Sequence, residues 1–108
     1  MEELTLEFTN QHMLYKCYMS FTKEGGLFVA TNRHYELGQS LALNVLLPEE
    51  ETHYSVSGKV AWVNPSASHS HAPQGIGVAF IDDKHNLKER IEKRLGPLLG
   101  SSEPTYTL

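Results

Sequence analysis

The chain has 108 residues, of which 40% are hydrophobic and 20% are charged, and its formal net charge is −4 at pH 7. This composition is typical of one soluble globular domain and excludes a disordered chain. The acidic balance also argues against binding to nucleic acid, because phosphate contacts need clustered Lys and Arg side chains.

The first third of the chain contains two candidate strands. Residues 4–8 (LTLEF) alternate polar and apolar side chains, and residues 12–21 (HMLYKCYMSF) alternate well enough to form a second strand. Four clearer strands follow, each showing a hydrophobic period of two and bounded by turn residues. They cover residues 26–31, 41–48, 53–63 and 75–81.

After residue 81 the hydrophobic pattern becomes helical. Apolar side chains recur at spacings of four, four and three, at Leu87, Ile91, Leu95 and Leu98. Asp82 or Asp83 can cap the start of this helix, and Gly96–Pro97 should end or kink it. Short antiparallel strands followed by one helix predict a small β-barrel with the helix over one end. We expect a single domain over residues 1–108, with the barrel over about 4–81, the helix over about 83–99 and a tail over 100–108.

The single cysteine and the chain's start indicate the compartment. Cys17 cannot form an internal disulfide, which favours a reducing environment. The acidic start has no apolar run of signal-peptide length, and no segment is long enough to span a bilayer. We therefore expect a cytoplasmic protein with no direct membrane insertion.

Three short segments carry a resemblance to a known family. The runs GGLFV (25–29), GKVAW (58–62) and GIGVAF (75–80), in this order and spacing, resemble the PilZ domain. The resemblance implies a mainly β fold, a six-stranded antiparallel barrel with a C-terminal α-helix, and many members bind the second messenger cyclic di-GMP. The runs YMSFTKEGGLFVAT, YELGQ and EPTYTL are further similar to one subfamily, the stand-alone type IV pilus assembly proteins.

The chain departs from the ligand-binding members of that family. Those members carry an Arg-x-x-x-Arg run ahead of the barrel and an Asp/Asn-x-Ser-x-x-Gly turn, which supply guanidinium and short polar contacts to phosphate and guanine. Here no Arg precedes Arg33, and if Gly26 is the turn's glycine, Phe21 and Lys23 replace the Asp/Asn and Ser. We interpret residues 21–26 as a turn whose glycines are kept for positive φ. We expect no direct binding of cyclic di-GMP, and no cofactor.

Aromatic residues are the candidate partner contacts. Trp62 can join Val56 and Val60 in the core, by strand parity, or act as a contact anchor, as Trp often does at binding hot spots. In the resembled subfamily the Trp-Pro region contributes to partner binding. Tyr15 and Tyr18 pose the same choice, and the apolar end of the tail favours a docking role for it. The expected partner-binding residues are Trp62, Pro65, Tyr18, Tyr15, Phe28 and Tyr106.

The resemblance implies a non-enzymatic adaptor for type IV pilus biogenesis and twitching motility, monomeric alone and recruited to the pilus machinery at the inner membrane. The implied partners are the PilB-type pilus-extension ATPase and a FimX-type EAL-domain receptor of cyclic di-GMP. One alternative is a cyclic di-GMP receptor that uses an unconventional site of Lys23, Arg33 and Lys59. Another is a metalloprotein around His69 and His71, which have the spacing of a metal pair but no third ligand nearby, so we expect no metal and no catalysis.

Overall fold

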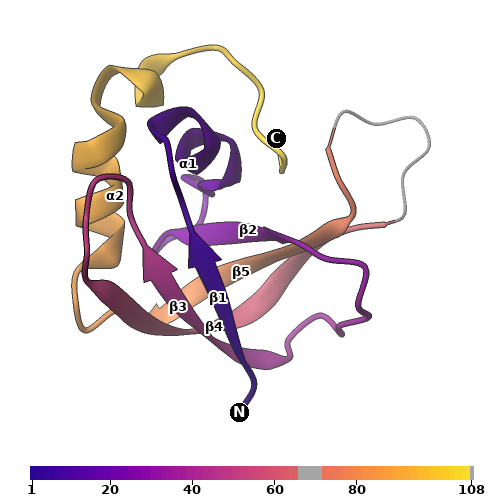
Figure 1. The fold of residues 1–108 in the computed structure, drawn as a ribbon. Coiled ribbons are helices and arrows are strands. Elements are labelled where there is room, and N and C mark those ends of the chain that lie inside the picture. Colours follow the sequence, from indigo (N-terminus) through magenta and orange to yellow (C-terminus); the bar gives the residue numbers. More distant parts are fainter. Residues whose placement is uncertain (66–71, 108) are drawn as a thin grey trace.

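The computed structural model describes residues 1–65 and 72–107, which form one curved sheet with helices at one side of it (Figure 1). Five strands and two α-helices are present in this part of the chain, followed by a short 3₁₀ helix, η1. In chain order they are β1 (Glu3–Glu7), α1 (Gln11–Cys17), β2 (Gly26–Ala30), β3 (Ser40–Leu46), β4 (His53–Asn64), β5 (Gly75–Asp82), α2 (Leu87–Leu95) and η1 (Gly96–Gly100).

The strands form a single sheet in the order β1-β3-β4-β5-β2. The pairs β3–β4, β4–β5 and β2–β5 are antiparallel, whereas β1 runs parallel to β3. The register between β4 and β5 shifts between Ser57 and Gly58 and again between Val60 and Trp62. Such irregularities bend a strand and increase its twist, which is consistent with the curvature of the sheet.

The structure confirms the mainly β fold with a C-terminal helix and corrects two details. The predicted barrel of six antiparallel strands is, within the described residues, a sheet of five strands with one parallel pair. The strand predicted over residues 12–21 is wrong, because helix α1 occupies most of this segment. Asn10 begins that helix by accepting a hydrogen bond from the Met13 N–H at 2.8 Å. Only Tyr18, which bridges Leu27, retains a strand-like contact.

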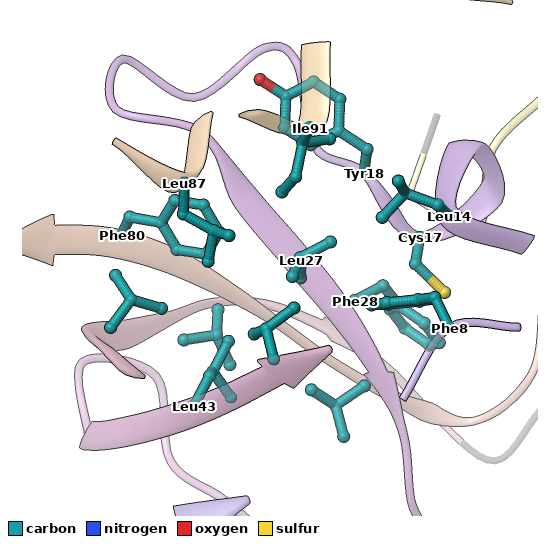
Figure 2. Packing of buried hydrophobic residues seen from close by; sticks show 14 of the residues in the cluster. Phe8, Leu14, Cys17, Tyr18, Leu27, Phe28, Leu43, Phe80, Leu87 and Ile91 are labelled. Atoms are coloured by element: carbon teal, nitrogen blue, oxygen red, sulfur yellow. The ribbon is translucent and has the colours of Figure 1, made fainter. Parts of the chain in front are cut away.

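The core lies between the concave face of the sheet and the helices (Figure 2). Leu27 and Phe28 of β2 occupy its centre, with Leu87 and Ile91 of α2 on one side and Leu14 of α1 on another. The alternating side chains predicted to share one face of β3 and the start of the following loop are all fully buried: Leu41, Leu43, Val45 and Leu47. Both helices are therefore held by apolar contacts with the sheet.

Helix α2 has the ends that its sequence indicates. The Asp83 carboxylate accepts the N–H groups of Leu87 and Lys88 at 2.6 and 2.9 Å, so the predicted capping role of Asp83 is confirmed. The helix ends at Leu95, and Gly96, with φ of 50°, turns the chain into η1. The α-helix is therefore shorter than the predicted range of 83–99. No helix in the described ranges is long and apolar enough to cross a membrane.

Candidate functional site

The turn before β2 has two glycines with different structural roles. Gly25 has φ of +83°, a conformation that L-residues with a side chain rarely adopt. Gly26 does not need positive φ: a Cβ added there would lie 2.6 Å from the carbonyl oxygen of Val78 on β5. The interpretation that both glycines are kept for positive φ is therefore corrected, since Gly26 is required by the close approach of two strands.

The two positions that carry polar ligand contacts in cyclic di-GMP binders hold different chemistry here. Phe21 stands at the Asp/Asn position with 46% of its surface exposed, and its ring centroid lies 5.7 Å from that of Trp62. Lys23 stands at the Ser position, and its carbonyl oxygen accepts a hydrogen bond from Lys88 Nζ at 3.0 Å. The turn thus presents an aromatic side chain where a polar one would meet the nucleotide.

Two of the three cations of the alternative receptor site lie far apart. Lys23 precedes β2 and Arg33 follows it, so the strand separates them by about 16 Å. The Arg33 guanidinium is paired with the Glu2 carboxylate at 2.5 Å and lies over the Tyr35 ring at 5.4 Å. Lys59 is an exposed residue of β4. Lys23 and Arg33 therefore do not lie together in one site.

Trp62 is half-buried near the end of β4, between the core and the surface. Its Nε1–H donates to Asn64 Oδ1 at 2.7 Å, and its ring contacts Phe21. A Cβ on Gly77, opposite Trp62 in β5, would lie 2.7 Å from Met19 Sδ and 2.8 Å from Trp62 Cβ, so a glycine there leaves room for both side chains. The structure therefore fixes the indole in place and still leaves part of it accessible.

A small pocket opens on the other side of Phe21. Its volume is about 190 Å³, and it lies between the end of α1, η1 and the C-terminal segment. Leu99, 37% exposed, stands at its edge. The pocket is lined by Tyr15, Tyr18, Ser20, Phe21, Leu99, Ser101, Glu103 and Thr105. We refer to Trp62, Phe21 and Leu99 together with this pocket as the aromatic surface.

The two tyrosines of the pocket are buried and use their hydroxyls internally. Tyr15 Oη donates to the Glu103 carbonyl oxygen at 2.5 Å, and Tyr18 Oη donates to Glu92 Oε2 at 2.6 Å. These bonds tie α1 to the C-terminal segment and to α2. The tyrosines therefore shape the pocket, and their hydroxyls are already bonded within the domain.

Comparison with known protein families identifies the family of this chain. A scan of protein-family models matches residues 2–95 to the PilZ domain, a range that contains all five strands and α2. The chain belongs to the PilZ domain family. PilZ domains are generally non-enzymatic binding or adaptor domains, and the family connects this chain to cyclic di-GMP signalling. Among curated proteins, none matched the chain.

The PilZ domain brings together three of the six residues predicted to contact partners. Tyr15, Tyr18 and Trp62 lie at the aromatic surface. Phe28, only 1% exposed, lies in the core behind it, and its ring contacts Tyr106 at a centroid distance of 5.4 Å. A partner therefore reaches Phe28 only after Tyr106 has moved.

Pro65 lies apart from the other five. By strand alternation Trp62 and Asn64 face one side of β4, whereas Val63 faces the other. Pro65 and Val63 line a separate pocket of about 280 Å³ beside the segment that contains Arg33. If Pro65 contacts a partner, it does so on a different face of the PilZ domain from Trp62.

Three residues of the site were not selected from the sequence. The sequence did contain a signal for Phe21: an aromatic residue at the polar position of the motif suggests that nucleotide contacts have been replaced by protein contacts. The sequence contained no such signal for Leu99 and Asn64, because their roles depend on the packing of η1 and of the C-terminal segment. Among the described residues no three metal-ligating side chains come together; the pair His69 and His71 lies outside them.

Two buried acids behind the aromatic surface predict a loss of stability at alkaline pH. Burial raises the pKa of Cys17 from 9.0 to about 12. Burial and the hydrogen bond to Glu92 raise the pKa of Tyr18 well above its ordinary value of 10.0. Because both pKa values are higher in the folded state, their stabilisation is complete below pH 9 and is lost as the pH rises further. We expect the free energy of unfolding to fall by about 3 kcal/mol between pH 8 and 10.5, with the larger part from Cys17.

Urea denaturation at the two pH values measures this loss. The double variant Cys17→Ala with Tyr18→Phe should be less stable at pH 8 but should lose less stability on going to pH 10.5. An equal loss in the wild type and the double variant would assign the alkaline effect to other groups.

Proposed function

We propose that this PilZ domain is a non-enzymatic adaptor for type IV pilus biogenesis and twitching motility. It links the PilB-type pilus-extension ATPase to a FimX-type EAL-domain receptor of cyclic di-GMP, in the cytoplasm at the inner membrane, and does not bind the nucleotide itself. The observation that carries the proposal is Phe21: at the turn position where nucleotide binders have Asp or Asn, it contacts Trp62 and is half exposed. The similarity of YMSFTKEGGLFVAT and EPTYTL to the pilus assembly subfamily supports the choice of partners.

The missing ligand-binding residues support the proposal that the domain does not bind cyclic di-GMP itself. Hydrogen bonds to charged groups contribute about 1.5–3 kcal/mol each. Without the paired Arg residues and the polar turn, at least two such bonds are missing, which weakens binding by about a hundredfold or more. Of the three remaining candidate cations, Lys23, Arg33 and Lys59, the first two lie at opposite ends of β2. A receptor for the nucleotide would need them together.

The aromatic surface supports the proposed adaptor function. Aromatic residues at protein interfaces carry a large share of the binding energy when they lie in well-packed positions. Trp62 is held by Asn64 and Phe21, so little side-chain entropy is lost when a partner covers it. Next to it, the pocket offers a recess of about 190 Å³ for an apolar side chain of the partner.

The decisive experiment is a binding titration with purified partners. Isothermal calorimetry would measure the affinity of the wild-type chain for the extension ATPase and for the EAL-domain receptor of the same bacterium. Trp62→Ala should weaken at least one of the two complexes about tenfold or more. Ile81→Ala removes a different exposed apolar side chain, at the far end of β5, and should change neither affinity. Circular dichroism should show that both variants are folded.

The outcomes separate the candidate functions. Unchanged binding by Trp62→Ala keeps the adaptor function and removes Trp62 from the interface. No binding to either partner contradicts the adaptor function. Cyclic di-GMP is titrated in parallel, and heat that fits a low-micromolar dissociation constant would favour the receptor with an unconventional site.

A further inference from the structure

The C-terminal segment, residues 101–107, folds back over the domain. Figure 1 shows it running from η1 past α1 toward the sheet. The Tyr106 N–H donates to the Lys16 carbonyl oxygen at 2.9 Å, and the Tyr106 carbonyl oxygen accepts from Asn64 Nδ2 at 2.8 Å. The Glu103 carbonyl oxygen accepts from Tyr15 Oη at 2.5 Å. These bonds place the segment across α1 and the end of β4.

The segment is held against the domain by backbone hydrogen bonds. It has no regular secondary structure, and the three bonds above all use its backbone. Its main aromatic anchor is Tyr106, whose ring contacts Phe28 and lies 5.7 Å from Lys16 Nζ. An exposed pair between His12 and Glu103 at 3.4 Å adds little, because solvent screens it. Ordering a segment of this length costs conformational entropy, which offsets part of what these contacts contribute to the docked state.

Thr107 makes the docked state less favourable. Its side chain is only 4% exposed, and its Oγ1 is the buried side-chain polar atom that lacks a hydrogen-bond partner among the described residues. A hydroxyl that loses water without gaining a partner destabilises the state that buries it. Releasing the segment returns this hydroxyl to water, so Thr107 shifts the balance toward the released state.

Docking of the segment also builds part of the aromatic surface. Ser101, Glu103 and Thr105 form one wall of the pocket beside Phe21, so the pocket exists only when the segment is docked. The Asn64 side chain connects the segment to Trp62: Oδ1 accepts from Trp62 Nε1, and Nδ2 donates to the Tyr106 carbonyl oxygen. Both sides of the aromatic surface therefore depend on the same segment.

We infer that residues 101–107 act as a reversible latch that completes the aromatic surface when it closes, with Asn64 as the positioning residue that transmits closure to Trp62. A ligand that fills the pocket contacts the closed state only, so ligand and closed latch stabilise each other. The existence of the latch does not depend on the proposed function; its coupling to a partner does.

Hydrogen exchange on the full-length protein tests the latch without any partner. The reporter is the Tyr106 amide, which is protected only while it donates to Lys16. Thr107→Val keeps the shape of the side chain and removes the unpartnered hydroxyl, so protection of this amide should rise about tenfold. Tyr106→Ala removes the aromatic anchor and should lower protection of that backbone amide by a similar factor. Thr5→Val, on the exposed face of β1, is the matched control and should leave it unchanged.

Each outcome of the exchange experiment either supports or overturns the latch. Unchanged or lower protection in Thr107→Val overturns the inference, because the hydroxyl then does not oppose docking. Opposite shifts in the two variants support the latch. Fluorescence of Trp62, the chain's one tryptophan, should change in Tyr106→Ala if Asn64 transmits closure, and an unchanged spectrum would remove that role.

A titration of the extension ATPase then tests the coupling. Thr107→Val should bind more tightly than wild type and Tyr106→Ala more weakly, although neither residue lines the pocket. In one outcome, amide protection shifts as expected while both variants bind the ATPase with wild-type affinity. That result supports the latch and contradicts its coupling to partner binding at the aromatic surface. If wild type does not bind at all, the proposed function fails and the exchange result still stands.

Discussion

Phe28→Ala should lower the free energy of unfolding by about 3–5 kcal/mol. The Phe28 side chain is 1% exposed, lies in the middle of β2 and is packed between the sheet, α1 and the ring of Tyr106. Truncation removes its apolar burial and leaves a cavity that the surrounding strands can fill only in part. Since domains of this size are stable by about 5–15 kcal/mol, the variant should be marginally folded. Urea denaturation followed by circular dichroism measures the change.

Phe21→Ala is the matched control, because it removes the same side chain from a half-exposed position seven residues earlier. It should change stability by less than about 1 kcal/mol and should instead weaken partner binding. The contrast separates the two kinds of aromatic residue in this chain. A Phe28→Ala variant that is fully stable but fails to bind would show that Phe28 is a contact residue, as its sequence context predicts.

Gly75→Ala should be comparably damaging, with a loss of at least about 3 kcal/mol or failure to fold. A Cβ at this position would lie 2.2 Å from the Val29 carbonyl oxygen and 2.6 Å from Phe28 Cζ. The first of these atoms belongs to the backbone of the paired strand β2, so relief requires β2 and β5 to separate. The yield of soluble protein and its urea midpoint measure the effect.

Gly100→Ala provides the control for the Gly75 variant. A Cβ there meets no atom within 4 Å, and Gly100 does not have positive φ. Its stability should remain within about 0.5 kcal/mol of wild type. If Gly75→Ala proves equally neutral, β2 and β5 are able to move apart at this end and the pairing of Ala30 with Gly75 is not essential to the fold.

Much of the fold follows from the hydrophobic periods of the sequence. Strands β3 and β4 alternate clearly between buried and more exposed side chains, and α2 repeats its apolar residues at helical spacing. Helix α1 is short, and Tyr15 and Cys17 suit the period of two, whereas the burial of the adjacent Leu14 fits only a helix. The capping side chain of Asn10 was the signal that favoured a helix. The parallel pairing of β1 with β3 had no local signal, since it depends on the path of the intervening chain.

The site could be predicted only in part, for a physical reason. Aromatic residues stabilise both cores and interfaces, so a sequence rich in them does not say which of the two each residue serves. Strand parity placed Trp62 correctly on the inward side, but the contact with Phe21 that leaves it half-buried arises from the preceding turn. Tyr106 and Phe28 lie together because the C-terminal segment returns to the sheet, which no period in the sequence predicts.

The sheet order has a consequence for how the protein is made. Strands β1 and β2 come from the first thirty residues, yet they pair with β3 and β5, on opposite sides of the β3-β4-β5 meander. During synthesis β2 emerges before its partner β5, and the two can pair fully only after residue 82 has been translated, a wait of about 3–10 s at ordinary elongation rates. Throughout that interval Leu27 and Phe28, the centre of the future core, have no sheet to join. The nascent chain is therefore exposed to chaperones and to aggregation through a segment whose Leu27 and Phe28 the finished protein buries almost completely.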